Sequence, residues 1–233
     1  MHQESDQAAA IRLQEEAYYG ALSADADYDE LVSLRTELEA SYRRTLETDP
    51  DDVDTLTGLG VLLTTLVQLP GPDAVELLER AFELDPSDED ACTNLATLLG
   101  EVGDEEEVDM VYQKALEAGN SNAAFELAAR LDERGEVEEA EPLYRRAAEA
   151  GHADAMANLA DLLAERGADD EVTRLFRHAL AEGGSASLNQ SGRSIAKYNT
   201  ERAATLFQRL IEAGDDTARV NLTELTSPSG QKQ

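Results

Sequence analysis

The chain has 233 residues, of which 5% are aromatic and none is Trp. Its core must therefore be built from Leu, Ala and Val, which favours closely packed helices over a sheet sandwich. The formal net charge is −31, and residues 1–120 alone carry 30 acids against six bases, a field that repels nucleic acid and anionic membrane surfaces. One cysteine, Cys92, permits no internal disulfide and favours a cytoplasmic protein, and the longest apolar stretch, VLLTTLVQLP, is too short to cross a bilayer.

Two helices are expected at the start of the chain. Ile11 and Tyr18 fall on one face of the first, and Leu31, Leu38 and Tyr42 fall on one face of the second. We expect residues 1–52 to form N-terminal capping helices and a divergent first repeat.

A 32-residue period organises the middle of the chain. Leu95, Leu127 and Leu159 are separated by this step, and four further series share it: Gly103, Gly135 and Gly167; Tyr112, Tyr144 and Phe176; Ala115, Ala147 and Ala179; Gly119, Gly151 and Gly183. An internal repeat of this length predicts a solenoid.

Each repeat has the pattern of two short helices. In 121–152, Ala124, Leu127 and Ala128 lie on one helical stripe, and Gly135 is placed to end that helix in a left-handed conformation. The second helix begins in the acidic run EVEEAEPLY and ends in YRRAAEAG, where arginines complement the helix dipole. In the preceding repeat, Asp104 and Glu107 have capping-box spacing.

These patterns predict an all-α fold, an α/α superhelical solenoid of about six helix-turn-helix repeats. We expect regular repeats in 53–184, a divergent repeat with a C-terminal capping helix in 185–226, and a disordered tail in 227–233. The segment 183–200 contains no acid in a strongly acidic chain. It is either a decayed repeat held by its neighbours or an exposed segment specific for a partner.

The repeats resemble the tetratricopeptide repeat family and, more closely, its Sel-type relatives. LGVLL followed by Ala74, Ala81 and ELDPSDEDA is similar to the tetratricopeptide pattern, and YRRAAEAGHADAMANLADLLAERG is similar to the Sel-type pattern. The 32-residue period is shorter than the usual unit of either family. The resemblance implies a superhelix whose first helices line a concave groove that holds peptides or protein surfaces.

Carried onto this sequence, the groove positions of the family include Asp54 and Thr57 among the exposed residues of the first helices. An asparagine recurs before the repeating leucine, and its amide can hold an extended peptide backbone or bond within its own repeat junction. The candidate groove residues are Asp90, Asn94, Glu126, Asp154, Asn158, Asp161, Glu165 and Asn221.

No catalytic constellation, metal site or cofactor motif stands out, so we predict a non-enzymatic scaffold. Its acidic groove is expected to bind a basic or polar segment of a protein partner, with no nucleic acid or membrane partner and with possible self-association through the end repeats. The alternative is a regulatory sensor domain that binds a small peptide or metabolite and changes the shape of the superhelix.

Overall fold

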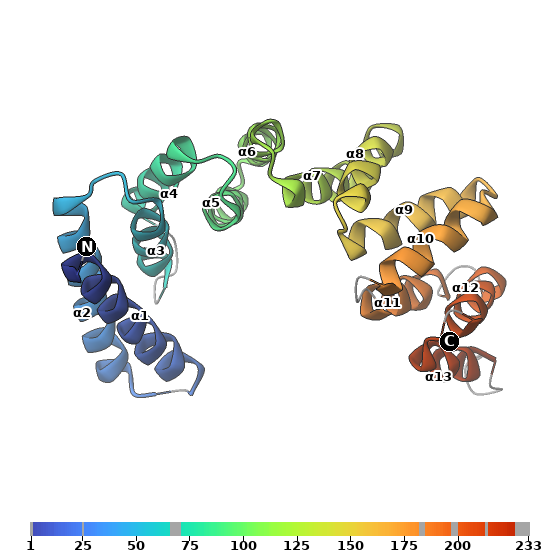
Figure 1. Ribbon diagram of the computed structural model, residues 1–233, viewed down its shortest axis with the longest axis horizontal. Coiled ribbons are helices and arrows are strands. Elements are labelled where there is room, and N and C mark those ends of the chain that lie inside the picture. Colours follow the sequence, from blue (N-terminus) through green and yellow to red (C-terminus); the bar gives the residue numbers. More distant parts are fainter. Residues whose placement is uncertain are drawn as a thin grey trace. The chain divides into compact units, whose positions relative to one another are not determined.

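The computed structural model describes residues 2–24, 26–65, 71–181, 185–196, 200–212 and 214–226. Within these ranges it contains thirteen helices and no strand, which confirms the predicted all-α class and its helix-turn-helix repeats (Figure 1). The predicted disordered tail, 227–233, lies outside the described residues. The helices are α1 (His2–Ser23), α2 (Tyr28–Thr48), α3 (Val53–Thr64), α4 (Pro72–Leu84), α5 (Glu89–Val102), α6 (Glu105–Ala118), α7 (Ser121–Glu133), α8 (Val137–Glu149), α9 (Ala153–Glu165), α10 (Asp169–Ala181), α11 (Ser185–Ala196), α12 (Thr200–Glu212) and α13 (Asp216–Thr226).

The helices form two compact units, residues 1–120 and 121–233, called here the N-terminal and C-terminal units. The N-terminal unit contains α1–α6 and the C-terminal unit contains α7–α13. Inside each unit, consecutive helices pack against each other as antiparallel pairs, and each pair also contacts the next. The division between the units falls at a repeat junction inside the block 53–184. None of the described helices combines the length and the apolar composition that crossing a membrane requires.

Five of the described helices begin at a side chain that accepts the backbone N–H three residues later. Asp52, Asp88 and His152 start the first helices of three pairs in this way, with distances of 2.7, 2.7 and 3.3 Å, and Asp215 starts α13 at 3.1 Å. Asp104 caps α6 in the same manner at 3.2 Å, as its capping-box spacing predicts. Because the first N–H groups of a helix have no partner within the helix, these caps favour the start of the five helices at these residues.

Glycines end the helices of the regular repeats. Gly103, Gly119, Gly135, Gly151 and Gly167 all have a positive φ, between 74° and 101°, which confirms the left-handed conformation predicted for Gly135. Only glycine adopts this conformation without a steric penalty, so the 32-residue glycine period is a period of helix ends. Gly183, the last glycine of its series, lies outside the described residues.

Small residues and leucines form the packed faces. The repeating leucines Leu95, Leu127 and Leu159 are buried, as are the alanines that follow them. A Cβ atom at Gly60 in α3 would lie 2.7 Å from Leu78 Cγ in α4. The absence of side chains at such positions is therefore what allows paired helices to approach closely.

The acid-free segment 183–200 contributes α11 to the C-terminal unit. Leu188 and Asn189 are buried in it, and a Cβ atom at Gly192 would lie 2.5 Å from Phe207 Cε1 in α12. Gly192, an unfavourable residue inside a helix, is thus required by the close approach of Phe207. The part of the segment that forms α11 is thus packed into the C-terminal unit.

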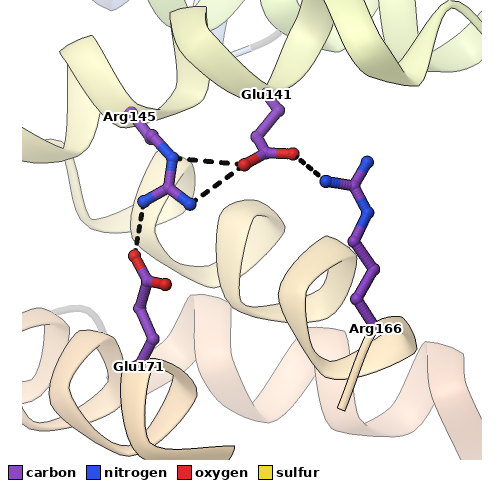
Figure 2. A network of polar contacts seen from close by, with 4 residues as sticks. All are labelled: Glu141, Arg145, Arg166 and Glu171. Carbon is purple, nitrogen blue, oxygen red and sulfur yellow. Dashed lines mark hydrogen bonds and ion pairs between the residues drawn. The ribbon is translucent and has the colours of Figure 1, made fainter. Parts of the chain in front are cut away.

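Ion pairs connect successive repeats in the C-terminal unit (Figure 2). Arg145 of α8 pairs with Glu141 one turn earlier at 2.9 Å and also with Glu171 of α10, while Arg166, after α9, pairs with Glu141. Arg145, near the end of a second helix, therefore does more than complement the helix dipole, because it also bonds to the next repeat. The hydrogen bond from Arg145, with those from Arg166, lowers the pKa of Glu141.

Candidate functional site

An acidic pocket occupies the N-terminal unit. The cavity has a volume of about 780 Å³ and is lined by α1, the end of α2, α3 and the start of α5. Two of the predicted groove residues, Asp90 and Asn94, lie in its wall, as do Asp54 and Thr57. The pocket thus brings together first-helix residues of two successive repeats with residues of the N-terminal helices.

One stripe of α3 faces the pocket. Asp54, Thr57, Gly58 and Val61 are spaced three and four residues apart, so they lie above one another on the same side of the helix. A Cβ atom at Gly58 would lie 2.7 Å from Tyr42 Oη, so the missing side chain makes room for the phenol of α2.

A tyrosine–glutamate bond connects α2 with α1 at this pocket. The Tyr42 hydroxyl donates a hydrogen bond to the Glu15 carboxylate, and both residues line the cavity. Burial and this bond raise the pKa of Tyr42 well above its ordinary value, so the phenol stays protonated and remains a donor. The bond therefore holds α1 and α2 at the edge of the pocket.

The charges of the pocket are strongly unbalanced. Arg12 is the single base among the lining residues, against six carboxylates: Glu15, Asp49, Asp52, Asp54, Asp88 and Asp90. Burial and the charges of Asp52, Asp88 and Asp90 raise the pKa of Asp54, and only the Arg12 guanidinium opposes them. A bound cation would relieve this repulsion.

Some carboxylates of the pocket make hydrogen bonds within the fold, and others do not. Asp52 and Asp88 each cap a helix with one oxygen. In the described part of the chain, the carboxylates of Asp54 and Asp90 make no hydrogen bond or ion pair. The side-chain amide of Asn94 donates to the Asp90 carbonyl oxygen at 2.8 Å, so this asparagine bonds within its own helix.

Five further predicted residues lie in the C-terminal unit, on α7 and α9, and the structure describes the side chains of four of them. Burial raises the pKa of the half-buried Glu126, and the Asp154 carboxylate adds to this effect while His152 and Arg130 oppose it. Asp154 is exposed in the first turn of α9, and Asp161 lies two turns further along the same helix.

Asn158 is the fourth of these residues, and its side chain bonds inside the fold. Its amide donates to Tyr144 Oη of α8 at 3.1 Å, and Tyr144 donates in turn to an Asp132 carboxylate oxygen of α7 at 3.4 Å. Asn158 therefore takes the structural role that was the alternative to peptide binding.

Asn221 is not an exposed groove residue, contrary to the prediction. It is 9% exposed, and its amide donates to Asn189 Oδ1 at 2.6 Å. The Asn189 amide donates to Asp215 at 2.8 Å, and Asp215 caps α13. Since α11 packs against α13, this position faces a neighbouring helix. The side chain of Glu165 lies outside the described residues.

The sequence interpretation missed the contribution of the N-terminal helices to the pocket. Arg12, Glu15 and Tyr42 belong to segments that were expected only to cap the repeats. In α1, Arg12 and Glu15 lie next to the buried Ile11 and Tyr18 along the helix, and this position is only a weak sequence signal for a binding site. Thr57 was expected to be exposed but is 7% exposed.

A second cavity, of about 410 Å³, lies between α8, α9 and α10 in the C-terminal unit. Its lining mixes charges of both signs, with Arg145, Arg174 and His178 beside Glu149 and Glu171. Arg145 and Glu171 pair with each other, so this cavity carries no comparable charge excess. Among the described residues, no three His, Cys, Asp or Glu side chains are grouped so as to hold a metal ion.

Comparisons with known proteins agree with this fold. Residues 121–189 match the family model described as Tetratrico peptide repeat. The sequence matches none of the curated proteins significantly.

Three solved structures show the extent of the likeness. The c5321 protective antigen of uropathogenic Escherichia coli, which displays an SLR fold, is 23% identical over 81% of this chain and 44% of that chain, with a TM-score of 0.57. PilF of Pseudomonas aeruginosa is 19% identical over 96% of this chain and 100% of that chain, with a TM-score of 0.57. Yeast Tom70 is 18% identical over 87% of this chain and 46% of that chain, with a TM-score of 0.53. Residues 121–189 are therefore similar to the tetratricopeptide repeat family, and the solved structures show that the chain shares the helix-turn-helix repeat fold.

Proposed function

We propose that this protein is a non-enzymatic interaction scaffold, and that the acidic pocket of its N-terminal unit holds a basic segment of a protein partner. The observation that carries the proposal is the excess of six carboxylates over one guanidinium in a cavity of about 780 Å³. A cationic segment is the ligand whose charge this lining complements. The single cysteine, Cys92, is buried and forms no internal disulfide, which fits a cytoplasmic setting.

The affinity is expected to come from several weak contacts. Each exposed ion pair contributes only about 0.2–1 kcal/mol, and salt screens it. Asp54 and Asp90 are available for such pairs, since the fold does not use their carboxylates, while Asp52 and Asp88 add long-range attraction. Binding should therefore require more than one basic residue and should weaken as salt is added.

The acidic residues of α7 and α9 are a second part of this proposal. Glu126, Asp154 and Asp161, with Glu165, give the C-terminal unit acidic positions of its own on first helices. We propose that they contact a basic partner separately from the pocket. Asn158 and Asn221 are left out of this set, because their amides bond inside the fold.

The test is direct binding of labelled peptides to the full chain, measured by fluorescence anisotropy at low and high salt. The peptides share one Gly/Ser backbone and carry three lysines, three glutamates or no charge. We expect only the lysine peptide to bind, and its affinity to fall with salt. Equal binding of all three peptides, or of none, would contradict the proposal.

Charge-neutralising variants locate the binding site. Asp54→Asn with Asp90→Asn should lower the affinity for the lysine peptide by about 2- to 30-fold, as expected for two exposed ion pairs. The matched control is Glu76→Gln with Glu83→Gln on the exposed face of α4, which changes the net charge equally and leaves the pocket untouched. If the control variant loses as much affinity as the pocket variant, binding depends on net charge and not on the pocket.

A further inference from the structure

The hydroxyl of Thr57 is buried at the pocket without a hydrogen-bond partner. The residue is 7% exposed, lines the cavity, and its Oγ1 is one of the buried side-chain atoms of the described chain that no donor or acceptor reaches. Buried hydroxyls are almost always bonded, because an unmet hydrogen bond destabilises the fold. An exception in the wall of a cavity points to a group that the cavity is built to receive.

Other helical threonines of this chain satisfy their hydroxyls locally. Thr36 donates to the Val32 carbonyl oxygen at 2.7 Å, and Thr97 donates to the Thr93 carbonyl oxygen at 2.8 Å. This bond to the preceding turn is the usual solution for threonine in a helix. Thr57 does not make it, so its hydroxyl keeps both its proton and its lone pairs for another group.

The surroundings of Thr57 restrict the chemistry of that group. Asp54 lies one turn earlier on the same face of α3, and Asp90 lies in the pocket wall, so the charge to be received is positive. Ile11 and Val61 provide apolar lining next to these polar atoms. The site therefore combines a buried acceptor, nearby carboxylates and an apolar wall.

We propose that Thr57 Oγ1, turned into the cavity by a change to the second χ1 rotamer that helical threonines adopt, accepts a hydrogen bond from the ammonium group of a lysine side chain, which the Asp54 carboxylate neutralises. The inference rests on the proposed function and names the anchoring residue of the basic segment. Lysine suits this site better than arginine because its ammonium is compact, has three freely rotating donors and ends a thin apolar stem. A guanidinium is a planar fork of five donors that favours paired acceptors, which a single covered hydroxyl does not offer.

The experiment compares the lysine peptide with an arginine peptide of otherwise identical sequence, using the full chain at low salt. We expect the wild type to prefer the lysine peptide, and Thr57→Val to lose about tenfold or more of its affinity for that peptide and most of its preference. Thr57→Ser, which keeps the hydroxyl, should retain the preference. Valine replaces the hydroxyl by a methyl group of similar size, so the melting temperature of Thr57→Val should be unchanged or higher.

The outcomes separate this inference from the proposed function. Equal or tighter binding of the arginine peptide, or unchanged lysine binding by Thr57→Val, overturns the lysine anchor and leaves the basic-segment scaffold standing. Failure of both peptides to bind overturns the proposed function itself. If neither peptide binds but spermidine does, and Thr57→Val weakens the binding of spermidine, the ammonium group does not come from a protein segment and that assignment is overturned.

Discussion

Replacing Gly58 by alanine should destabilise the N-terminal unit, although the same substitution ordinarily stabilises a helix. Gly58 lies inside α3, where alanine is more favourable than glycine by about 1 kcal/mol. A Cβ atom at this position, however, would lie 2.7 Å from Tyr42 Oη, 2.8 Å from Cζ and 3.0 Å from Cε1. Tyr42 is 2% exposed, so its ring must shift within its packed surroundings to make room for the new methyl group.

The expected loss of stability follows from the contacts of Tyr42 that the substitution would strain or break. Forcing one carbon into a packed site costs about 1–3 kcal/mol. Moving the phenol also strains or breaks its bond to the Glu15 carboxylate, and bonds to charged groups contribute about 1.5–3 kcal/mol. After the gain in helix propensity, we expect the free energy of unfolding to fall by roughly 2–4 kcal/mol.

The assay is thermal and urea unfolding followed by far-ultraviolet circular dichroism. Gly100→Ala is the matched control, because Gly100 also lies in a helix of the N-terminal unit and a Cβ atom there would meet no neighbouring group within 4 Å. This control should stabilise the unit by about 0.5–1 kcal/mol. Tyr42→Phe combined with Gly58→Ala removes the nearest clashing atom, so the double variant should lose less stability than the two single variants together.

A Gly58→Ala protein as stable as the wild type would refute this reasoning. It would mean that the Tyr42 ring moves without cost, and that the Tyr42–Glu15 bond does not hold the edge of the pocket. Simple additivity of the two substitutions would lead to the same conclusion.

Four further outcomes are expected. His152→Ala should cost about 1 kcal/mol in urea unfolding, because it removes the cap of α9 and the stacking of His152 on Phe125, whereas His152→Asp should keep the cap. The hydrogen bond from Arg145 lowers the pKa of Glu141, so the stability that this carboxylate adds is present above the unfolded value of about 4.3 and is lost as the pH falls through the lower folded value. Glu141→Gln should accordingly flatten the fall of the melting temperature between neutral and acidic pH, and an unchanged slope would count against the network. Because the pKa of Asp54 is raised, affinity for the lysine peptide should weaken on acidification at a higher pH than an ordinary aspartate would give, which a pH series of anisotropy titrations would detect. The melting temperature should rise from low to molar salt, since screening relieves repulsion among the carboxylates, and a flat or falling value would contradict this.

The helices and their ends could be predicted from the sequence because both depend on short-range chemistry. The leucine period at Leu95, Leu127 and Leu159 shows which face of each first helix is buried. Gly135 ends its helix as predicted because a positive φ favours glycine wherever it occurs. Asp104 caps α6 because the short side chain of an aspartate at the N-cap can reach the N–H three residues later.

The pocket could not be predicted in the same way, because it depends on contacts between distant parts of the chain. Tyr42 and Glu15 are 27 residues apart, and they meet only because α1 and α2 pack against each other. Asn221 has the sequence context of a groove residue, yet it bonds to Asn189, 32 residues away, because α11 covers it. The period of the apolar residues shows which face of a helix is apolar. It does not show which side chains another helix places against a polar position, because that depends on how the two helices pack. The sequence by itself therefore determined the repeating helices and the glycines that end them, and only the tertiary structure decided that Thr57 is buried in the wall of an acidic pocket and that Asn221 is not exposed.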